Sequence, residues 1–260
     1  MVPGRRDVRT AVRAGVRAAP RAAGRNTGRI AAGLAVGVAA IVSLPGAALA
    51  YRPLITDDAS VNPRGQCQLE TWWGHTQRYE QWHAAPACGV GANLEIGLEY
   101  VGIDPREPDP YAIGAQLKTA FPGLKWGEWD FGAKLATLTA RTGSPKGWAS
   151  ESVALVGLAS GEVIEGWVVH VNLGVDYRRR DDRTGGVYGA AVVWEFAERA
   201  FAFAEVDGDP RFGAVRSAGA RWWIFKDRLG LDATVGKQAG QSGSTYYTLG
   251  ISYYGFGAFD

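Results

Sequence analysis

Apolar and polar positions alternate along most of the chain after residue 50, with the period of two that is typical of β-strands between unlike environments. From Trp167 to Tyr177 every odd position is apolar, and the even positions include His170, Asn172 and Asp176. No stretch after residue 50 sustains a helical period beyond two turns. With turn residues as dividers, the pattern predicts twelve strands, near residues 67–76, 81–90, 93–102, 111–121, 128–140, 149–159, 163–178, 186–197, 200–207, 213–225, 228–237 and 244–255.

The connections between these expected strands alternate in length. They are tight after the second, eighth and tenth strands and short after the fourth and sixth. Most of the others are longer and rich in Pro, Gly and charge, such as DPREPDP and QAGQSGS, and only the first hairpin departs from the rule. Short turns at one rim and longer loops at the other are typical of an antiparallel up-and-down transmembrane β-barrel.

The same alternation would also suit a secreted soluble β-barrel or sandwich with an apolar interior. Two features favour the membrane barrel: the polar face mixes Gly with single charges, and aromatic residues gather near the strand ends. The aromatic residues expected near the short-turn rim are Trp126, Trp129, Trp167, Trp194, Trp223, Phe225 and Tyr253. Those expected near the long-loop rim are Tyr79, Tyr100, Tyr111, Trp148, Tyr177, Tyr188 and Tyr247. The expected fold is therefore all-β, a barrel of about twelve strands.

The first fifty residues differ from the rest in composition. They hold eight Arg and one Asp, then the apolar run from Ile30 to Ala50, which ends in the small-residue site Ala48-Leu49-Ala50. This order predicts a secretory signal peptide over residues 1–50, although an amphipathic transit helix or a later true start stays open. Residues 51–66 would form a periplasmic or plug segment, and residues 67–260 the barrel. Beyond residue 50 the chain is mildly acidic, which argues against a nucleic-acid partner.

The two cysteines of the chain, Cys67 and Cys88, lie in the first two expected strands. In a hairpin centred near residues 77–78, positions whose numbers sum to about 155 face each other, and the two cysteines meet this condition. An exported protein with an even pair of cysteines favours a disulfide over two reduced thiols. No metal site or cofactor is expected, because paired-His and Cys-x-x-Cys spacings are absent from the sequence.

The charged and amide residues on the polar faces would line the lumen. Salt bridges among them would block a narrow lumen, whereas in a wider one they would set the charge preference of a channel. Near His170 and Asn172 no Gly-x-Ser-x-Gly motif supports a lipase, so no catalytic residue is expected. Thr56, Asp57 and Asp58 could plug the lumen or bind a cation, but turn formation is favoured. The lumen-lining candidates are Glu70, Glu95, Glu99, Gln116, Lys118, Asp130, Lys134, His170, Asn172, Asp176, Arg178, Arg216 and Asp232.

Several short motifs resemble those of proteobacterial barrel proteins of the "MetA-pathway of phenol degradation" type. They are residues 51–60 (YRPLITDDAS) and 63–71 (PRGQCQLET), which resemble the opening of those proteins, and residues 93–98 (NLEIGL) and 228–236 (RLGLDATVG), which resemble their hairpin exits. The resemblance spans most of the chain after residue 50. It implies an outer-membrane transport barrel.

The expected function is that of an outer-membrane channel or transporter for small molecules, including hydrophobic or aromatic ones. The expected partners are outer-membrane lipid, the barrel-assembly machinery during insertion and a small-molecule solute. Two alternatives stay open: a non-conducting structural barrel and a secreted soluble β-protein.

Overall fold

A computed structural model describes residues 54–77, 80–103, 111–141, 148–179, 182–209, 213–239 and 245–257. The expected signal peptide, Tyr79 and parts of the long loops lie outside these residues, as does the side chain of Trp148. All of the described residues belong to one compact unit. Within them, no helix is long and apolar enough to cross a membrane.

The described residues form twelve strands, in agreement with the alternation of the sequence. The strands are β1 (Gln66–Thr76), β2 (Glu80–Gly91), β3 (Leu94–Ile103), β4 (Tyr111–Trp126), β5 (Trp129–Arg141), β6 (Trp148–Ile164), β7 (Trp167–Arg178), β8 (Arg183–Ala197), β9 (Ala200–Asp209), β10 (Gly213–Phe225), β11 (Leu229–Gln238) and β12 (Thr245–Gly257). Pro86 lies within β2, and β6 continues to Ile164, beyond its expected end.

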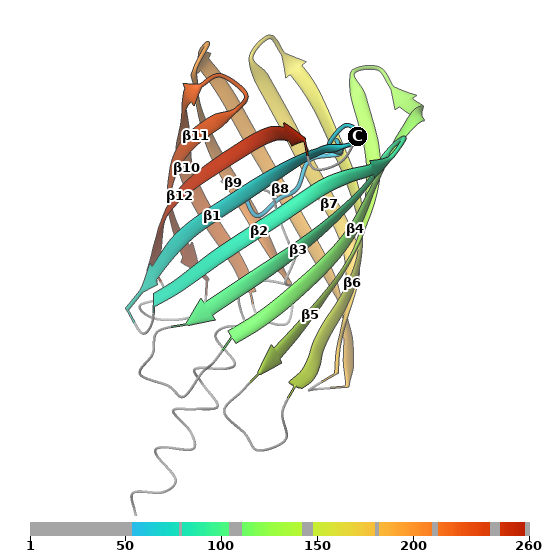
Figure 1. Cartoon of the computed structure of the whole chain (residues 1–260), viewed down its shortest axis with the longest axis vertical. Coiled ribbons are helices and arrows are strands. Elements are labelled where there is room, and N and C mark those ends of the chain that lie inside the picture. Colours follow the sequence, from blue (N-terminus) through green and yellow to red (C-terminus); the bar gives the residue numbers. More distant parts are fainter. Residues whose placement is uncertain are drawn as a thin grey trace, which may run out of the picture. The chain divides into compact units, whose positions relative to one another are not determined.

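Each strand pairs antiparallel with its neighbours in the sequence, and β1 pairs with β12 to close the barrel (Figure 1). The predicted fold class is therefore confirmed. Closure leaves no unpaired strand edge, which is the condition for a sheet to span a bilayer. The tight turns after the even-numbered strands lie at one rim, the short-turn rim, and include Gly127 and Gly166, whose positive φ of 58° and 74° suits residues without a side chain. The opposite end is the long-loop rim.

The predicted pairing of the first hairpin is confirmed. Cys67 faces Cys88 and Trp73 faces Trp82, so the paired numbers sum to the expected 155. Cys67 and Cys88 form a disulfide with a Cα–Cα distance of 4.1 Å. The bridge ties β1 to β2 near the short-turn rim.

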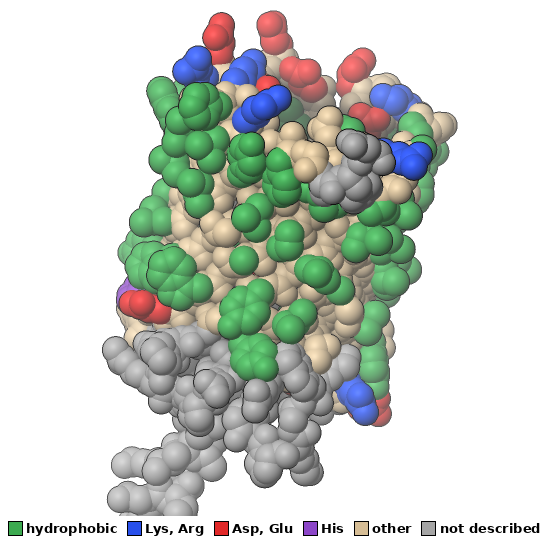
Figure 2. Space-filling model, viewed as in Figure 1, with side chains coloured by type: hydrophobic (Ala, Val, Ile, Leu, Met, Phe, Trp, Pro, Cys, Tyr) green, Lys and Arg blue, Asp and Glu red, His purple; other side chains and the backbone are tan. Residues whose placement is uncertain are grey.

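The outer wall of the barrel is apolar. Leu173 is 65% exposed, while its neighbour Asn172, on the other parity of β7, is buried in the lumen. Trp126 at the end of β4 is 78% exposed. Figure 2 shows apolar side chains spread over the strand wall, with charged side chains gathered at its upper edge. An apolar band bounded by aromatic and charged residues is the outer surface of a membrane-spanning barrel.

Two expected placements on β10 are wrong, and Asp130, which has the inward parity of β5, lies at the rim rather than inside the lumen. Asp130 is exposed and pairs with exposed Lys125 at 2.9 Å, close to the turn between β4 and β5. Arg216 has the outward parity of β10, because Val215 and Ser217 on either side of it are buried in the lumen. Trp223 has the inward parity and belongs to the lumen rather than to the outer aromatic belt. Charged and aromatic residues occur on both faces of β10, so its alternation in the sequence is ambiguous.

Candidate functional site

Residues 54–65, here called the N-terminal segment, lie inside the barrel before the chain enters β1. Two small apolar clusters hold the segment, one on β8 and β9 and the other on β6. Leu54 packs with Ala191, Val193 and Phe203. Ala59 packs with a second cluster formed by Ala154, Val156 and Leu158 of β6.

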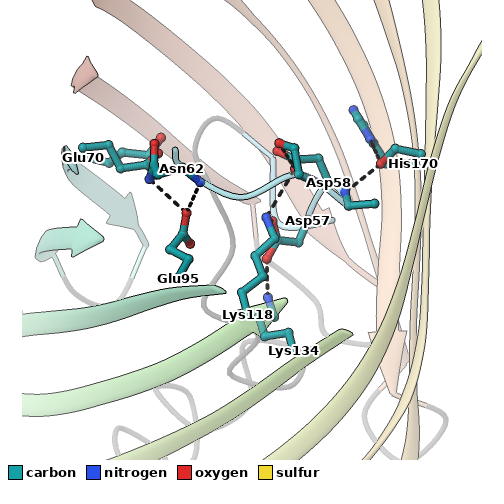
Figure 3. A network of polar contacts seen from close by, with 12 residues as sticks. Asp57, Asp58, Asn62, Glu70, Glu95, Lys118, Lys134 and His170 are labelled. Atoms are coloured by element: carbon teal, nitrogen blue, oxygen red, sulfur yellow. Dashed lines mark hydrogen bonds and ion pairs between the residues drawn. The ribbon is translucent and has the colours of Figure 1, made fainter. Parts of the chain in front are cut away.

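Asp57 is the most enclosed polar residue of this segment, with no exposed surface. Its Oδ1 accepts a hydrogen bond from Nζ of Lys118 at 2.8 Å, and its Oδ2 accepts one from Nζ of Lys134, also at 2.8 Å (Figure 3). Both lysines are fully buried. The side-chain amide of Asn172 accepts a hydrogen bond from the Asp57 N–H at 2.7 Å and donates one to its carbonyl at 2.9 Å.

The arrangement of Lys118 and Lys134 follows from strand pairing. The two residues are direct partners across β4 and β5. Like charges directly opposite each other destabilise a sheet, and an unpaired buried ammonium group is costlier still. The carboxylate of Asp57 between the two ammonium groups removes both penalties, so the wall and the segment are electrostatically matched.

The next residues add contacts to other strands. Asp58 accepts a hydrogen bond from Lys118 at 3.3 Å and one from the N–H of Ser60 at 2.6 Å, the second being a local turn contact. The N–H of Ala59 donates to Oγ of Ser160 at 2.9 Å, and that oxygen lies 2.8 Å from Nδ1 of His170. Turn formation, the favoured interpretation of these aspartates, thus holds for Asp58 and is wrong for Asp57.

Both ends of the segment are held by carboxylates of the wall. The N–H groups of Ile55 and Thr56 donate to one oxygen of Glu205, at 2.8 and 2.9 Å. Toward the other end, the N–H and the side-chain amide of Asn62 donate to Glu95, both at 2.9 Å. These contacts reach β9 and β3, so the segment crosses the lumen.

Glycines on the inner wall make room for this path. A Cβ atom on Gly89 would lie 2.2 Å from the carbonyl oxygen of Asn62. A Cβ on Gly189 would lie 2.8 Å from Oγ1 of Thr56. Because the first contact is with backbone, the segment can follow its observed course only past a residue without a side chain.

A second polar network joins β10, β11, β12 and β1 beside the segment. Arg221 donates hydrogen bonds to Tyr254 at 2.7 Å, Ser252 at 2.8 Å and Asp232 at 3.1 Å. Tyr254 in turn donates to Glu70. These contacts cross-link the strands on either side of the β1–β12 closure.

A cavity of about 380 Å³ lies between the segment and the wall. Lys118, His170 and Asp58 contribute polar surface to it, and Val168, Phe201 and Trp223 contribute apolar and aromatic surface. Several of its lining residues come from strand ends next to the tight turns, including Glu195. The cavity therefore lies on the short-turn side of the lumen.

The structure places most of the expected lumen residues in the interior. Buried there are Glu70, Glu95, Lys118, Lys134, Asn172, Asp176, Arg178 and Asp232, with Glu99, Gln116 and His170 half-buried; Asp130 and Arg216 are the exceptions described above. Arg178 donates a hydrogen bond to Asp176 at 2.9 Å and lies 3.7 Å from Asp209. These three residues form a further polar group in the lumen, toward the long-loop rim.

Sequence reasoning missed several residues that hold the segment and its surroundings, including Ser160, Glu205 and Arg221. Glu205 and Arg221 are charged and share the inward parity of their strands, and that signal could have identified them. Ser160 and His170 form a close pair, but both face the lumen, and Ser160 also accepts the N–H of Ala59. Within the described residues, no group of three His, Cys, Asp or Glu side chains is placed to hold a metal ion.

Comparison with known proteins decides the family. Residues 38–253 match the family described as "Uncharacterised conserved protein UCP029691". The chain belongs to this family. The match does not bear on the resemblance to the phenol-degradation type, which stays a prediction, and no curated protein matches the chain.

Two solved porin structures share this fold. The KdgM porin in complex with disordered oligogalacturonate has a TM-score of 0.58 and 7% identity, over 72% of this chain and 98% of that one. The NanC porin has a TM-score of 0.52 and 6% identity, over 73% of this chain and 98% of that one. At these identities the likeness concerns the fold alone, which is that of outer-membrane barrels.

Proposed function

We propose that this protein is an outer-membrane channel for small solutes whose lumen is closed at rest by the N-terminal segment. The observation that carries the proposal is how the segment is held. Its central contacts are hydrogen bonds and ion pairs with separate strands, including those of Asp57, rather than one continuous apolar core. Such polar contacts can be replaced by contacts with water or with a solute that enters the lumen, whereas the burial of a large apolar core could not be replaced in this way.

The outer wall supports residence in the outer membrane. Its apolar side chains would be exposed to water in a soluble barrel, which would favour aggregation. Export would use the signal peptide expected over residues 1–50, with the assembly machinery inserting the barrel. Cell fractionation with selective detergent extraction tests this. Recovery of the protein in the soluble periplasm would contradict it.

The cavity suggests a kind of solute. Phe201, Trp223 and Val168 give it an apolar side, which suits a hydrophobic or aromatic small molecule. The resemblance of residues 51–60 and 63–71 to barrel proteins linked with phenol degradation agrees with such a solute. This part of the proposal concerns solute class only, and no enzymatic step is assigned to the lumen.

Planar-bilayer conductance of the folded full chain tests the channel. We expect the wild type to be closed most of the time, since the segment crosses the lumen. Asp57→Asn removes the charge that holds Lys118 and Lys134 and should increase the open probability at least tenfold. Asp130→Asn, which removes an exposed carboxylate at the rim, is the matched control and should behave as wild type.

A second candidate function is that of a non-conducting structural barrel. The observation that favours it is that ion pairs occupy the lumen at several levels, from the Arg221 group to the Arg178 group. A folded Asp57→Asn protein that stays closed under all applied voltages would support this candidate against the channel.

A further inference from the structure

The two lysines that hold the N-terminal segment form a site for a carboxylate. We propose that the solute of this channel is a small carboxylate with an apolar body, and that Asp57 occupies its binding site at rest. The inference rests on the proposed channel function and names the solute class of the same lumen. The segment would then act as a tethered competitor that the solute must displace.

The first support is the geometry around Asp57. Each carboxylate oxygen lies 2.8 Å from a different ammonium nitrogen, and both lysines are fully buried. Lys118 and Lys134 are direct cross-strand partners, so their charges are fixed side by side by the sheet itself. An anion placed between its members stabilises such a pair, and the carboxylate of Asp57 takes that place here.

The second support is the charge that would stay behind. When the segment leaves the lumen, Asp57 and Asp58 leave with it, and both of them contact Lys118. Glu95 and Glu205, the wall carboxylates that had held the two ends of the segment, stay in the lumen. Lys118 has then lost the carboxylates of Asp57 and Asp58, and Lys134 has lost that of Asp57, so an entering carboxylate can take the place between the ammonium groups that Asp57 had occupied.

The third support is the cavity beside the pair. Lys118 lines this cavity of about 380 Å³, together with Phe201 and Trp223. Part of the lining belongs to the segment itself, including Leu54 and Asp58, so the space beside Lys118 widens when the segment leaves and can admit a small molecule. A molecule with one aromatic ring could place the ring against the apolar side while its carboxylate reaches Lys118. Simple inorganic anions lack the apolar part, so the cavity favours an aromatic or branched aliphatic acid.

Calorimetric titration of the folded full chain in detergent tests the site, with benzoate as the probe and uncharged benzamide as its isostere. Asp57→Ala removes the competing carboxylate and should bind benzoate at least tenfold more tightly than the wild type does. It should also prefer benzoate to benzamide by at least tenfold. Adding Lys134→Met to Asp57→Ala should abolish this preference. Asp130→Ala, altered at the rim, should bind as the wild type does.

Equal binding of benzoate and benzamide by Asp57→Ala would overturn the solute class. Conductance of the same variant separates the two proposals. A conducting variant without benzoate preference contradicts the carboxylate site and leaves the channel standing, whereas benzoate binding without conductance contradicts the channel and leaves the site standing.

The wild-type protein gives an independent test in case Asp57→Ala does not fold. Benzoate at high concentration should compete with Asp57 and increase the open probability, and benzamide at the same concentration should not. No difference between the two additives would count against the site.

Discussion

Lys118 and Lys134 face each other across the β4–β5 pairing, and the carboxylate of Asp57 binds both ammonium groups at 2.8 Å. The three charges lie in the middle of the lumen, where water does not reach their side chains. The segment that carries Asp57 is therefore part of the electrostatic balance of the lumen. It neutralises a charge pair that the strand register forces together.

Substitutions of Asp57 and of Lys134 should lower the stability of the barrel by different amounts. Asp57→Asn leaves two buried ammonium groups without their shared carboxylate and should lower the free energy of unfolding by about 3–5 kcal/mol. Lys134→Met should cost less, because Lys118 still pairs with Asp57. Urea unfolding of the barrel in vesicles measures both. A larger loss for Lys134→Met than for Asp57→Asn would contradict the central role of the carboxylate.

The close approach of the segment to β2 gives a steric prediction. In Gly89→Ala the new methyl group would lie 2.2 Å from the Asn62 carbonyl oxygen, so the segment must move away from the wall. We expect the barrel to assemble, and its open probability in planar bilayers to increase. Gly74→Ala is the matched control, because the nearest atom to its Cβ is 3.8 Å away, which is ordinary contact. Equal conductance of the two variants would show that the segment does not close the lumen.

The barrel could be predicted from the sequence because the patterns that indicate it involve residues close together in the chain. The alternation of the strands and the turn residues depend on residues that are close in sequence or share one face of a strand. The same holds for the hairpin register that pairs Cys67 with Cys88. Where β10 carries charges on both parities, at Arg216 and Arg221, the same rules failed. Small residues such as Ala218 and Gly219 gave no contrast between its two faces.

The path of the N-terminal segment could not be predicted, for the opposite reason. Its contacts join residues far apart in the chain, such as Thr56 and Glu205, and the segment has no periodicity that would indicate them. Asp57 looked like a turn residue because its neighbour Asp58 is one. Only the closed barrel brings Lys118 and Lys134 to the same place.

Acid should loosen the segment through Asp58. Burial works to raise the pKa of Asp58, but the charge of Lys118 and the hydrogen bonds from Ser60 outweigh it and hold the pKa below its ordinary value. A carboxyl with a lowered folded-state pKa stabilises the fold above its unfolded pKa, and this contribution is lost as the pH falls through the folded value. We expect this loss to increase the open probability below about pH 4. In Asp58→Asn this acid response should be smaller.

The disulfide should stabilise the barrel without closing the lumen. Cys67 and Cys88 are separated by 21 residues, and a loop of this length contributes about 3 kcal/mol in the chain-entropy description. The double variant Cys67→Ser/Cys88→Ser should therefore unfold at lower urea concentration, and its conductance should equal that of the wild type. Mass spectrometry of the wild type before and after reduction verifies the bridge. An increase in conductance on reduction would assign the bridge a role in holding the segment.

The two faces of β7 give the most direct test of the membrane orientation. Leu173 is 65% exposed on the outer wall, and its neighbour Asn172 is buried in the lumen, where it binds the backbone of Asp57. Leu173→Arg would place a charge in hydrocarbon, at a cost of roughly 2–4 kcal/mol near the bilayer midplane, and should impair insertion.

Asn172→Arg should insert normally, because the lumen is polar, but its longer side chain must displace the N-terminal segment and increase conductance. Heat-modifiable migration on gels measures insertion, and planar bilayers measure conductance. Successive side chains of one strand point to opposite faces, so the two variants cannot share one outcome in a membrane barrel. Normal insertion of Leu173→Arg with failed folding of Asn172→Arg would mean that the outer wall faces water. That result would contradict both the proposed channel and the proposed carboxylate site.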